Sequence, residues 1–386
     1  MREFGIYIHI PFCQQKCFYC DFPSFAGRER YIDGYLAALE QEICLWKGQY
    51  AGWDILGDGK LSPATVYIGG GTPTALGSSQ LERLLEILHR HIAIEAAAEF
   101  TVEMNPGTVD EGKLELLQEY GINRLSVGVQ SFDDACLKKI GRIHTAKEAE
   151  DIIHQAQAVG FDNISLDLIY GLPLQDMDVL QQSVARALSL GVQHISIYGL
   201  QLEKGTAFYR MEQMGKLQLP EDELVEKMYD YVARALPEAG YGRYEISNFA
   251  RSGYESRHNL SYWQDVPYLG FGSGAHGYWD DCRYENPADL GEYIEALKEK
   301  RLPARLEEKV TEKVHMEEFC FLGLRRAEGV SEKDFIERFG RSLNEIYDEA
   351  ISKLTAEGLL SADSRGIRLT ARGMKYGNQV FGEFLL

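Results

Sequence analysis

Residues 5–20 read GIYIHIPFCQQKCFYC, an apolar strand pattern that runs directly into three closely spaced cysteines. In a reducing compartment, a group such as Cys13, Cys17 and Cys20 is a metal or redox site far more often than a coincidence. Zinc would need a fourth ligand, and the only nearby histidine, His9, stands in the alternating strand pattern. An iron–sulfur cluster on three thiolates is favoured, because it leaves one iron open to a further ligand.

The strand before the cysteines is the first of six short segments rich in β-branched and aromatic residues, expected at residues 5–10, 64–69, 99–104, 124–129, 163–169 and 194–199. Amphipathic helical patterns at residues 30–46, 79–91, 110–120, 145–159 and 176–190 lie between them. This alternation predicts a parallel sheet with right-handed crossovers. Because six units are too few for a closed eight-stranded barrel, we expect an α/β fold with an incomplete parallel (β/α)6 barrel, and a doubly wound open sheet is the alternative.

Polar, glycine-rich or cysteine-bearing residues follow each predicted strand. Barrel enzymes collect their chemistry at the C-terminal ends of the strands, so we expect these residues to share a cavity. In chain order they are the loop 13–20, Gly69, Gly70, Gly71 and Thr72, Glu103 with Asn105, Gln130, Asp167, and Tyr198 with Gln201.

Three of these features have alternative interpretations. The glycine run lets a ligand approach backbone N–H groups, although alone it would indicate only a tight turn. Glu103 and Asp167 can accept hydrogen bonds from an ammonium group or a ribose hydroxyl. Arg142, within KKIGRIHT, could pair with a carboxylate, but its spacing alone favours a solvated surface charge.

Composition limits the partners and the location. The chain has 386 residues, with 59 Asp and Glu against 40 Lys and Arg, a formal net charge of -19. Such a surface repels phosphate backbones and anionic lipid, so we expect no nucleic-acid partner and no stable membrane insertion. The first residues lack a signal-peptide pattern, which favours a cytoplasmic protein. The four other cysteines, Cys44, Cys136, Cys282 and Cys320, are expected to be small buried hydrophobes.

Taken together, the motifs resemble the radical S-adenosylmethionine superfamily, in the branch that contains the oxygen-independent coproporphyrinogen III oxidases and the HemW-type haem chaperones. The matching segments, in order, are YIHIPFCQQKCFYCDF, YIGGGTPT, VEMNPG, RLSVGVQSF, GRIHT, LDLIYGLP, YEISNFA, HNLSYW and LGFGSGAHGY. The resemblance implies a 4Fe–4S cluster on the three cysteines, whose fourth iron takes S-adenosylmethionine. It implies contacts to S-adenosylmethionine from Tyr7, Gly70, Gly71, Thr72, Glu103, Gln130, Arg142 and Asp167.

Small differences decide the branch. The oxidases carry a further cysteine two positions after the third, where this chain has Phe22, and the form CDF resembles the chaperones. The oxidases also carry an N-terminal extension, whereas this sequence starts four residues before the strand. HNLSYW resembles the HNxxYW signature of the chaperones. The resemblance therefore implies haem binding, delivery of haem to an acceptor protein, and an electron donor such as flavodoxin or ferredoxin. An oxygen-independent coproporphyrinogen III oxidase, or another radical enzyme acting on a tetrapyrrole, is the alternative.

His258, within HNLSYW, is the side chain that we expect to ligate haem, because a neutral imidazole is a common axial donor. The alternative is a loop histidine that hydrogen-bonds a carbonyl group. Many aromatic residues lie between Tyr241 and Tyr284, and they fit either a flat tetrapyrrole or an ordinary core.

We expect three segments along the chain: the partial barrel at 1–240, an aromatic-rich extension at 241–303, and a C-terminal domain at 304–386. In the last segment, Ser331 and Ser342 open two helices, and strands at 359–361 and 367–370 flank a turn. This order predicts a winged-helix-like α+β domain. Because its acidic and basic residues are mixed, a DNA-binding role is not favoured, and a redox-sensing DNA regulator ranks below the other two functions.

Overall fold

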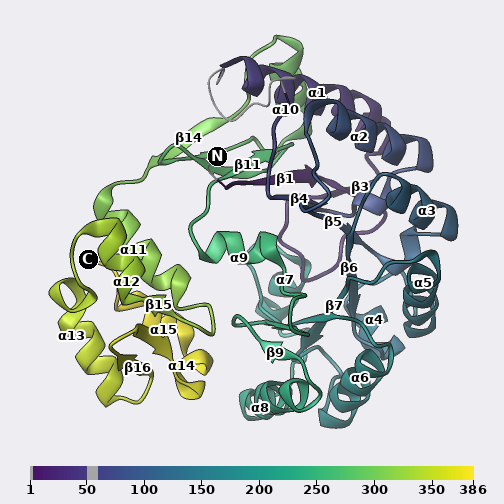
Figure 1. Cartoon of the computed structure of the whole chain (residues 1–386). Coiled ribbons are helices and arrows are strands. Elements are labelled where there is room, and N and C mark those ends of the chain that lie inside the picture. The colour runs from purple at the N-terminus through teal and green to yellow at the C-terminus, as the bar shows by residue number, and fades with distance from the viewer. Residues whose placement is uncertain (1–2, 50–59) are drawn as a thin grey trace.

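Six parallel strands form the centre of the structure, a computed structural model that describes residues 3–49 and 60–386 (Figure 1). They are neighbours in the order in which they occur along the chain: β1 (Gly5–Ile10), β4 (Thr65–Gly70), β5 (Glu99–Met104), β6 (Arg124–Gln130), β7 (Ile164–Tyr170) and β8 (His194–Gly199). A doubly wound sheet reverses its strand order at a switch point, and these six strands do not. The α/β fold with an incomplete parallel (β/α)6 barrel is therefore confirmed.

The predicted helices lie outside the curved sheet (Figure 1): α1 (Ile32–Gln49), α2 (Ser78–His91), α3 (Glu111–Glu119), α5 (Ala146–Val159) and α6 (Met177–Ser189). In α2, leucines 81, 84, 85 and 88 form a buried stripe of helical period that packs on the barrel. In α5, the side chain of Thr145 accepts a hydrogen bond from the backbone N–H of Glu148, and Gly160 ends the helix in a left-handed conformation. The helices α4 (Asp134–Lys139), α7 (Ala207–Gln213) and α8 (Asp222–Glu238) were not predicted.

Strands from the second predicted segment, and one from the start of the third, extend the sheet at both edges. β11 (Tyr268–Phe271) pairs in parallel with β1, and β12 (His276–Trp279), β13 (Cys282–Glu285) and β14 (Arg305–Lys309) continue it as antiparallel strands. At the other edge, β10 (Asn248–Ala250) pairs with β8, and β9 (Gly242–Arg243) pairs with β10. The helices α9 (Arg257–Trp263) and α10 (Leu290–Lys298) belong to this extension. The segment boundaries at 240 and 303 stay predictions.

A buried carboxyl group joins the extension to the barrel. Glu42 of α1 accepts hydrogen bonds from the Tyr293 hydroxyl of α10, the Asn286 amide and the Gly272 backbone N–H, at 2.6, 2.6 and 2.8 Å. Burial raises the pKa of this carboxyl to about 7. These bonds hold α1, α10 and the turn after β11 together, and they position the edge of the sheet beside β1.

The C-terminal domain has its own hydrophobic core. Its elements are α11 (Glu312–Gly323), β15 (Val330–Ser331), α12 (Glu332–Phe339), α13 (Leu343–Ala356), β16 (Leu360–Asp363), β17 (Gly366–Leu369), α14 (Ala371–Lys375) and α15 (Gly377–Gly382). The three short strands form one sheet in the order β15-β17-β16. Three helices followed by a hairpin match the predicted winged-helix-like arrangement. Ser331 and Ser342 accept hydrogen bonds from the backbone at the starts of α12 and α13, as expected.

The four single cysteines differ in how far they are exposed. Cys136 and Cys320 are buried, but Cys44 is exposed and Cys282 is partly exposed, so the expectation of burial is wrong for Cys44. Cys44 lies on the outward face of α1, beside His91.

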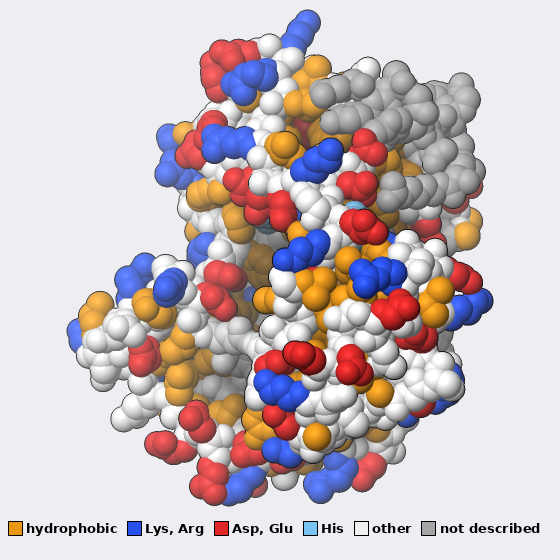
Figure 2. All heavy atoms as spheres, turned by 90° about the vertical axis from the view of Figure 1, so that its left-hand side faces the viewer, with side chains coloured by type: hydrophobic (Ala, Val, Ile, Leu, Met, Phe, Trp, Pro, Cys, Tyr) orange, Lys and Arg blue, Asp and Glu red, His pale blue; other side chains and the backbone are white. Residues whose placement is uncertain are grey.

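Acidic and basic side chains are interspersed on the face shown in Figure 2. Within residues 3–49 and 60–386, no helix combines the length and apolarity that a membrane span needs.

Candidate functional site

A cavity of about 570 Å³ lies at the C-terminal ends of the parallel strands. Its size is within the range of cavities that hold a cofactor or a drug-sized ligand. Most of the predicted site residues line it: Cys13, Cys17, Cys20, Gly70, Gly71, Thr72, Glu103, Gln130, Arg142 and Asp167. Asn105, Tyr198 and Gln201 line it as well, whereas Tyr7 and His258 do not. The shared cavity that was predicted from the strand ends is therefore present.

The cysteine loop is fixed at both ends and at its middle. At its ends, β2 (Phe12–Cys13) pairs in parallel with β3 (Phe25–Ala26). In the middle, the backbone N–H of Phe18 donates to the carbonyl of Ile140, and the backbone N–H of Phe208 donates to the carbonyl of Phe18. These contacts hold the three thiols against the cavity without any bond between them.

The three thiols suit a cluster better than a single zinc ion. A zinc site would need a fourth protein ligand, whereas a cube takes one thiolate at each of three irons and leaves the fourth iron open. All three thiols line the same cavity, so the donor set fits an iron–sulfur cluster.

Burial opposes ionisation of two of the three thiols, those of Cys13 and Cys20. Burial raises the pKa of the Cys13 thiol, and it raises the pKa of Cys20 to about 11, with a further increase from the neighbouring Cys17. The Thr72 hydroxyl, which lies 3.6 Å from the Cys13 sulfur, lowers the pKa of Cys13 by a smaller amount. A bound metal favours the thiolate form and offsets the cost of burial.

The glycine run serves close packing rather than an open N–H cradle. The Gly70 N–H donates to Glu103 Oε2 at 3.0 Å, and the N–H groups of Gly71 and Thr72 donate to the carbonyls of Ile10 and Phe12. The expectation of bare N–H groups for a ligand is therefore wrong for these three residues, because the Glu103 carboxyl group and the carbonyls of Ile10 and Phe12 already accept their hydrogen bonds. Gly70 has a φ of 107°, and a Cβ there would lie 2.5 Å from the His9 ring.

Glu103 is a partly buried carboxyl group in the wall of the cavity. Its Oε1 accepts a hydrogen bond from the Tyr67 hydroxyl at 2.8 Å, and its Oε2 accepts the bond from Gly70. Burial raises the pKa of Glu103 to about 7, and Asp167 adds to the increase. An ammonium ion in the cavity would restore the charged carboxylate, because opposite charges stabilise each other at short range.

Arg142 connects the cysteine loop to β6. Its guanidinium donates to the Cys17 sulfur at 3.5 Å and to the Gly128 carbonyl. The surface position that spacing alone favoured is wrong, since Arg142 lines the cavity. Gln130, two residues after Gly128, has a φ of 68° at an irregularity in the pairing of β6 with β7. Strained backbone of this kind is typical of functional sites.

Arg124 and Asn259 are among the cavity-lining residues that were not predicted. Arg124, at the start of β6, is 2% exposed, and its Nε atom has no hydrogen-bond partner. Asn259 lies on α9, directly after His258 in the HNLSYW motif. Both residues lie in segments that resemble the family, Arg124 in RLSVGVQSF and Asn259 in HNLSYW. The sequence does not show which side of the strand or helix faces the cavity.

Tyr7 lies on β1 beneath the cavity lining. Its hydroxyl is 2.9 Å from His9 Nδ1, and His9 Nε2 lies 2.8 Å from the carbonyl of Pro23, which follows the cysteines. With Tyr7 as donor to Nδ1 and Nε2 as donor to Pro23, one neutral tautomer satisfies both bonds. The pair therefore positions the cysteine loop from below, and a direct contact of Tyr7 with a cofactor stays a prediction.

His258 does not face the cavity. The residue is 1% exposed, Nδ1 lies 2.8 Å from the Thr65 hydroxyl, and Nε2 lies 2.8 Å from the Tyr262 hydroxyl. Burial lowers the pKa of this imidazole to about 3. Both ring nitrogens are occupied in this conformation, which fits a packing role, and the role of His258 as a haem ligand stays a prediction. Among the aromatic residues between Tyr241 and Tyr284, Phe249 and Phe271 are likewise core residues.

We expect His258→Ala to lower the free energy of unfolding by about 2–4 kcal/mol, because it leaves a cavity and two buried hydroxyl groups without partners. Chemical denaturation measures this loss, and His154→Ala, an exposed position on α5, is the matched control. The absorption spectrum of added haem should be the same for both variants. A changed Soret band in His258→Ala alone, with unchanged stability, would restore the ligand assignment.

Family models match two parts of the chain. The Radical SAM superfamily matches residues 7–187, and the HemN C-terminal domain matches residues 310–376. These regions correspond to most of the barrel and to most of the C-terminal domain.

Relatives and a solved structure resemble the chain over nearly its whole length. The chain is 43% identical to the heme chaperone HemW of Bacillus subtilis over 98% of both proteins, and 40% identical to that of Lactococcus lactis over 98% of this chain and 97% of the relative. The structure of coproporphyrinogen III oxidase (HemN) from Escherichia coli matches with a TM-score of 0.87 at 24% identity, covering 100% of this chain and 90% of that one, which shows the shared fold. With the three cysteines at the mouth of a partial barrel, these similarities show that the chain belongs to the heme chaperone HemW family of the radical S-adenosylmethionine superfamily.

Proposed function

We propose that this protein is a radical S-adenosylmethionine-type haem chaperone that holds a 4Fe–4S cluster, binds S-adenosylmethionine and haem, and transfers haem to an acceptor protein. The observation that carries the proposal is the cavity lined by Cys13, Cys17 and Cys20, in a chain 43% identical to a heme chaperone. An electron donor such as flavodoxin or ferredoxin is part of the proposal, because the cluster must be reduced from outside.

Different residues of the cavity would hold the cluster and S-adenosylmethionine. The three thiolates bind the cluster, which when reduced supplies one electron to the sulfonium of S-adenosylmethionine. Glu103 is suited to accept from the ammonium group or a ribose hydroxyl, and Arg142 is suited to pair with the carboxylate. Thr72, Gln130 and Asp167 complete the polar wall. Radical chemistry in this cavity would require that water be excluded from the reactive centre.

Coproporphyrinogen III oxidase activity is the second candidate, since the fold of the oxidase HemN matches this chain. Phe22, at the position of the additional cysteine of the oxidases, weighs against it. Phe22 is 60% exposed at the edge of the cavity, so it is not needed for packing. The experiment that separates the candidates is anaerobic incubation of reconstituted protein with haem and, separately, with coproporphyrinogen III. We expect stoichiometric haem binding and no modified porphyrin, and coupled formation of 5′-deoxyadenosine and a decarboxylated porphyrin would favour the oxidase.

The affinity for S-adenosylmethionine should increase with pH through the pKa of Glu103. The carboxyl group is largely protonated below about pH 7. An ammonium ligand binds its ionised form, so binding must release that proton at low pH and gains strength as pH rises. Equilibrium binding at pH 6 and pH 8 should show at least roughly a fivefold tighter complex at pH 8. Glu103→Gln should bind more weakly and with little pH dependence. A steep pH dependence that survives in Glu103→Gln would remove Glu103 from this role.

A further inference from the structure

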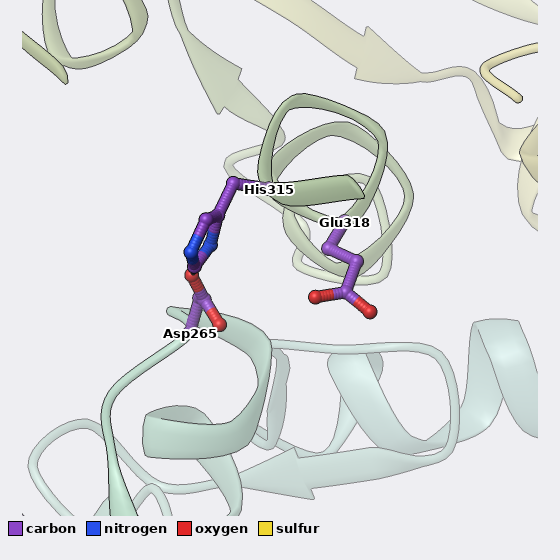
Figure 3. Close-up of side chains that lie close together, drawn as sticks. All are labelled: Asp265, His315 and Glu318. Atoms are coloured by element: carbon purple, nitrogen blue, oxygen red, sulfur yellow. The ribbon is translucent and has the colours of Figure 1, made fainter. Parts of the chain in front are cut away.

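A second group of titratable side chains lies outside the cavity, where the C-terminal domain meets the extended sheet. Asp265 follows α9, and His315 and Glu318 lie on α11, three residues apart and therefore on one face of the helix. Figure 3 shows the two side chains of α11 beside Asp265. One ligand atom from each residue lies within 4.8 Å of the other two. The three residues come from both domains.

Two atoms of this cluster are buried without hydrogen-bond partners. Glu318 is 5% exposed, and its Oε2 has none. His315 Nδ1 has none either, although it lies 3.6 Å from Asp265 Oδ2. That distance is too long for a hydrogen bond. Two ligands on one tetrahedral metal ion, at bond lengths of about 2.1 Å, lie roughly 3.4 Å apart, which is close to this spacing.

The surrounding groups have the arrangement that metal ligands require. His315 Nε2 lies 3.3 Å from Asp281 Oδ1, and a ligating histidine almost always pairs its other nitrogen with a carboxylate or carbonyl. Arg338 bonds to Asp265 at 2.5 Å, and Arg283 bonds to Glu318 through Oε1, which leaves Oε2 available. A carboxylate oxygen has two acceptor positions, so the bond from Arg338 still allows Asp265 to bind a cation.

The charge of the cluster also favours a divalent cation. Four carboxylates, those of Asp265, Asp281, Glu308 and Glu318, surround two guanidinium groups, those of Arg283 and Arg338. These carboxylates and guanidinium groups leave an excess of two negative charges. The Tyr278 hydroxyl, which is also buried, has no hydrogen-bond partner. A divalent cation would neutralise these two negative charges.

We propose that Asp265, His315 and Glu318 bind one divalent transition-metal ion, which ties the C-terminal domain to the barrel. Two oxygen ligands and one imidazole nitrogen suit manganese, iron(II), cobalt or zinc, and none of the three is a soft thiolate. The site is separate from the cysteines, so its occupancy is independent of the cluster.

Manganese(II) is the most direct probe, because oxygen and nitrogen ligands suit it and thiolates do not. Titration of the cluster-loaded protein, followed by the EPR signal of free manganese, should show one bound ion per chain. Asp265→Asn, His315→Ala and Glu318→Gln should each weaken binding at least about tenfold. Glu349→Gln, an exposed position on α13, is the matched control and should bind like the wild type.

Thermal unfolding gives a second measurement that does not depend on the stability of any one variant. An ion that binds only the folded chain raises Tm as its concentration increases. We expect this increase in the wild type and in Glu349→Gln, and its absence in the three ligand variants. Binding no tighter than about 1 mM, or equal binding in all the variants, would overturn the proposal and leave the cluster as an ion-pair contact between the domains.

Discussion

Replacing any one of Cys13, Cys17 and Cys20 with serine is expected to reduce the iron content of the anaerobically reconstituted protein from roughly four per chain to near zero. The cause is the number of ligands: only three thiolates line the cavity, so the loss of one leaves two irons of the cube without protein ligands. Serine is nearly isosteric, and its hydroxyl does not ionise near neutral pH. Iron and sulfide analysis, with the visible absorption of the cluster, measures the effect.

Cys44→Ser is the matched control for these variants. Cys44 is a free, exposed cysteine on the outside of α1, and the change should leave the iron content unaltered. Circular dichroism of each variant shows whether the barrel still folds. Full cluster content in any of the three variants would contradict the assignment of the ligands.

Gly70→Ala is expected to have the second large effect. The φ of 107° is costly for alanine, about 1–3 kcal/mol, and the new methyl group would lie 2.5 Å from His9, which adds about 1–3 kcal/mol of overpacking. His9 can yield only by giving up its bond to Pro23, so the cysteine loop should loosen. We therefore expect both a lower unfolding midpoint in urea and a lower cluster content than in the wild type.

Gly77→Ala provides the control for Gly70→Ala. Gly77 has a φ of -62° at the start of α2, and a Cβ there would meet nothing closer than 3.6 Å. The free energy of unfolding of Gly77→Ala should change by less than about 1 kcal/mol, although the variant loses an N-cap glycine. If Gly70→Ala is as stable as Gly77→Ala and keeps its cluster, the close packing of the turn against His9 is not needed for the site.

Much of the barrel could be predicted because short stretches of sequence specify its strands and helices. Each parallel strand is a short buried run with β-branched residues, and each helix has its own cap and apolar stripe, as in α2 and α5. The parallel pairing of β11 with β1 could not be predicted in this way. It joins Tyr268 to Gly5 across most of the chain, and no local pattern specifies a partner at that distance.

The site was predicted to a similar extent. Motif positions and strand ends identified Cys13, Glu103 and Asp167, because the C-terminal ends of parallel strands meet in space. For His258, the sequence shows that it lies in a motif, but not that its ring nitrogens contact Thr65 and Tyr262 while Asn259 lines the cavity. The direction of a side chain depends on how α9 packs on the barrel, and that packing involves Thr65, far away in the sequence.

The most direct measurement of the central claim is low-temperature EPR of the reduced, reconstituted protein before and after S-adenosylmethionine is added. If three thiolates hold a cluster whose fourth iron faces the cavity, the spectrum should be that of a reduced 4Fe–4S cluster, and its g values should shift when the ligand binds. An identical spectrum with and without S-adenosylmethionine, or protein that contains zinc in place of iron and sulfide, would contradict the account.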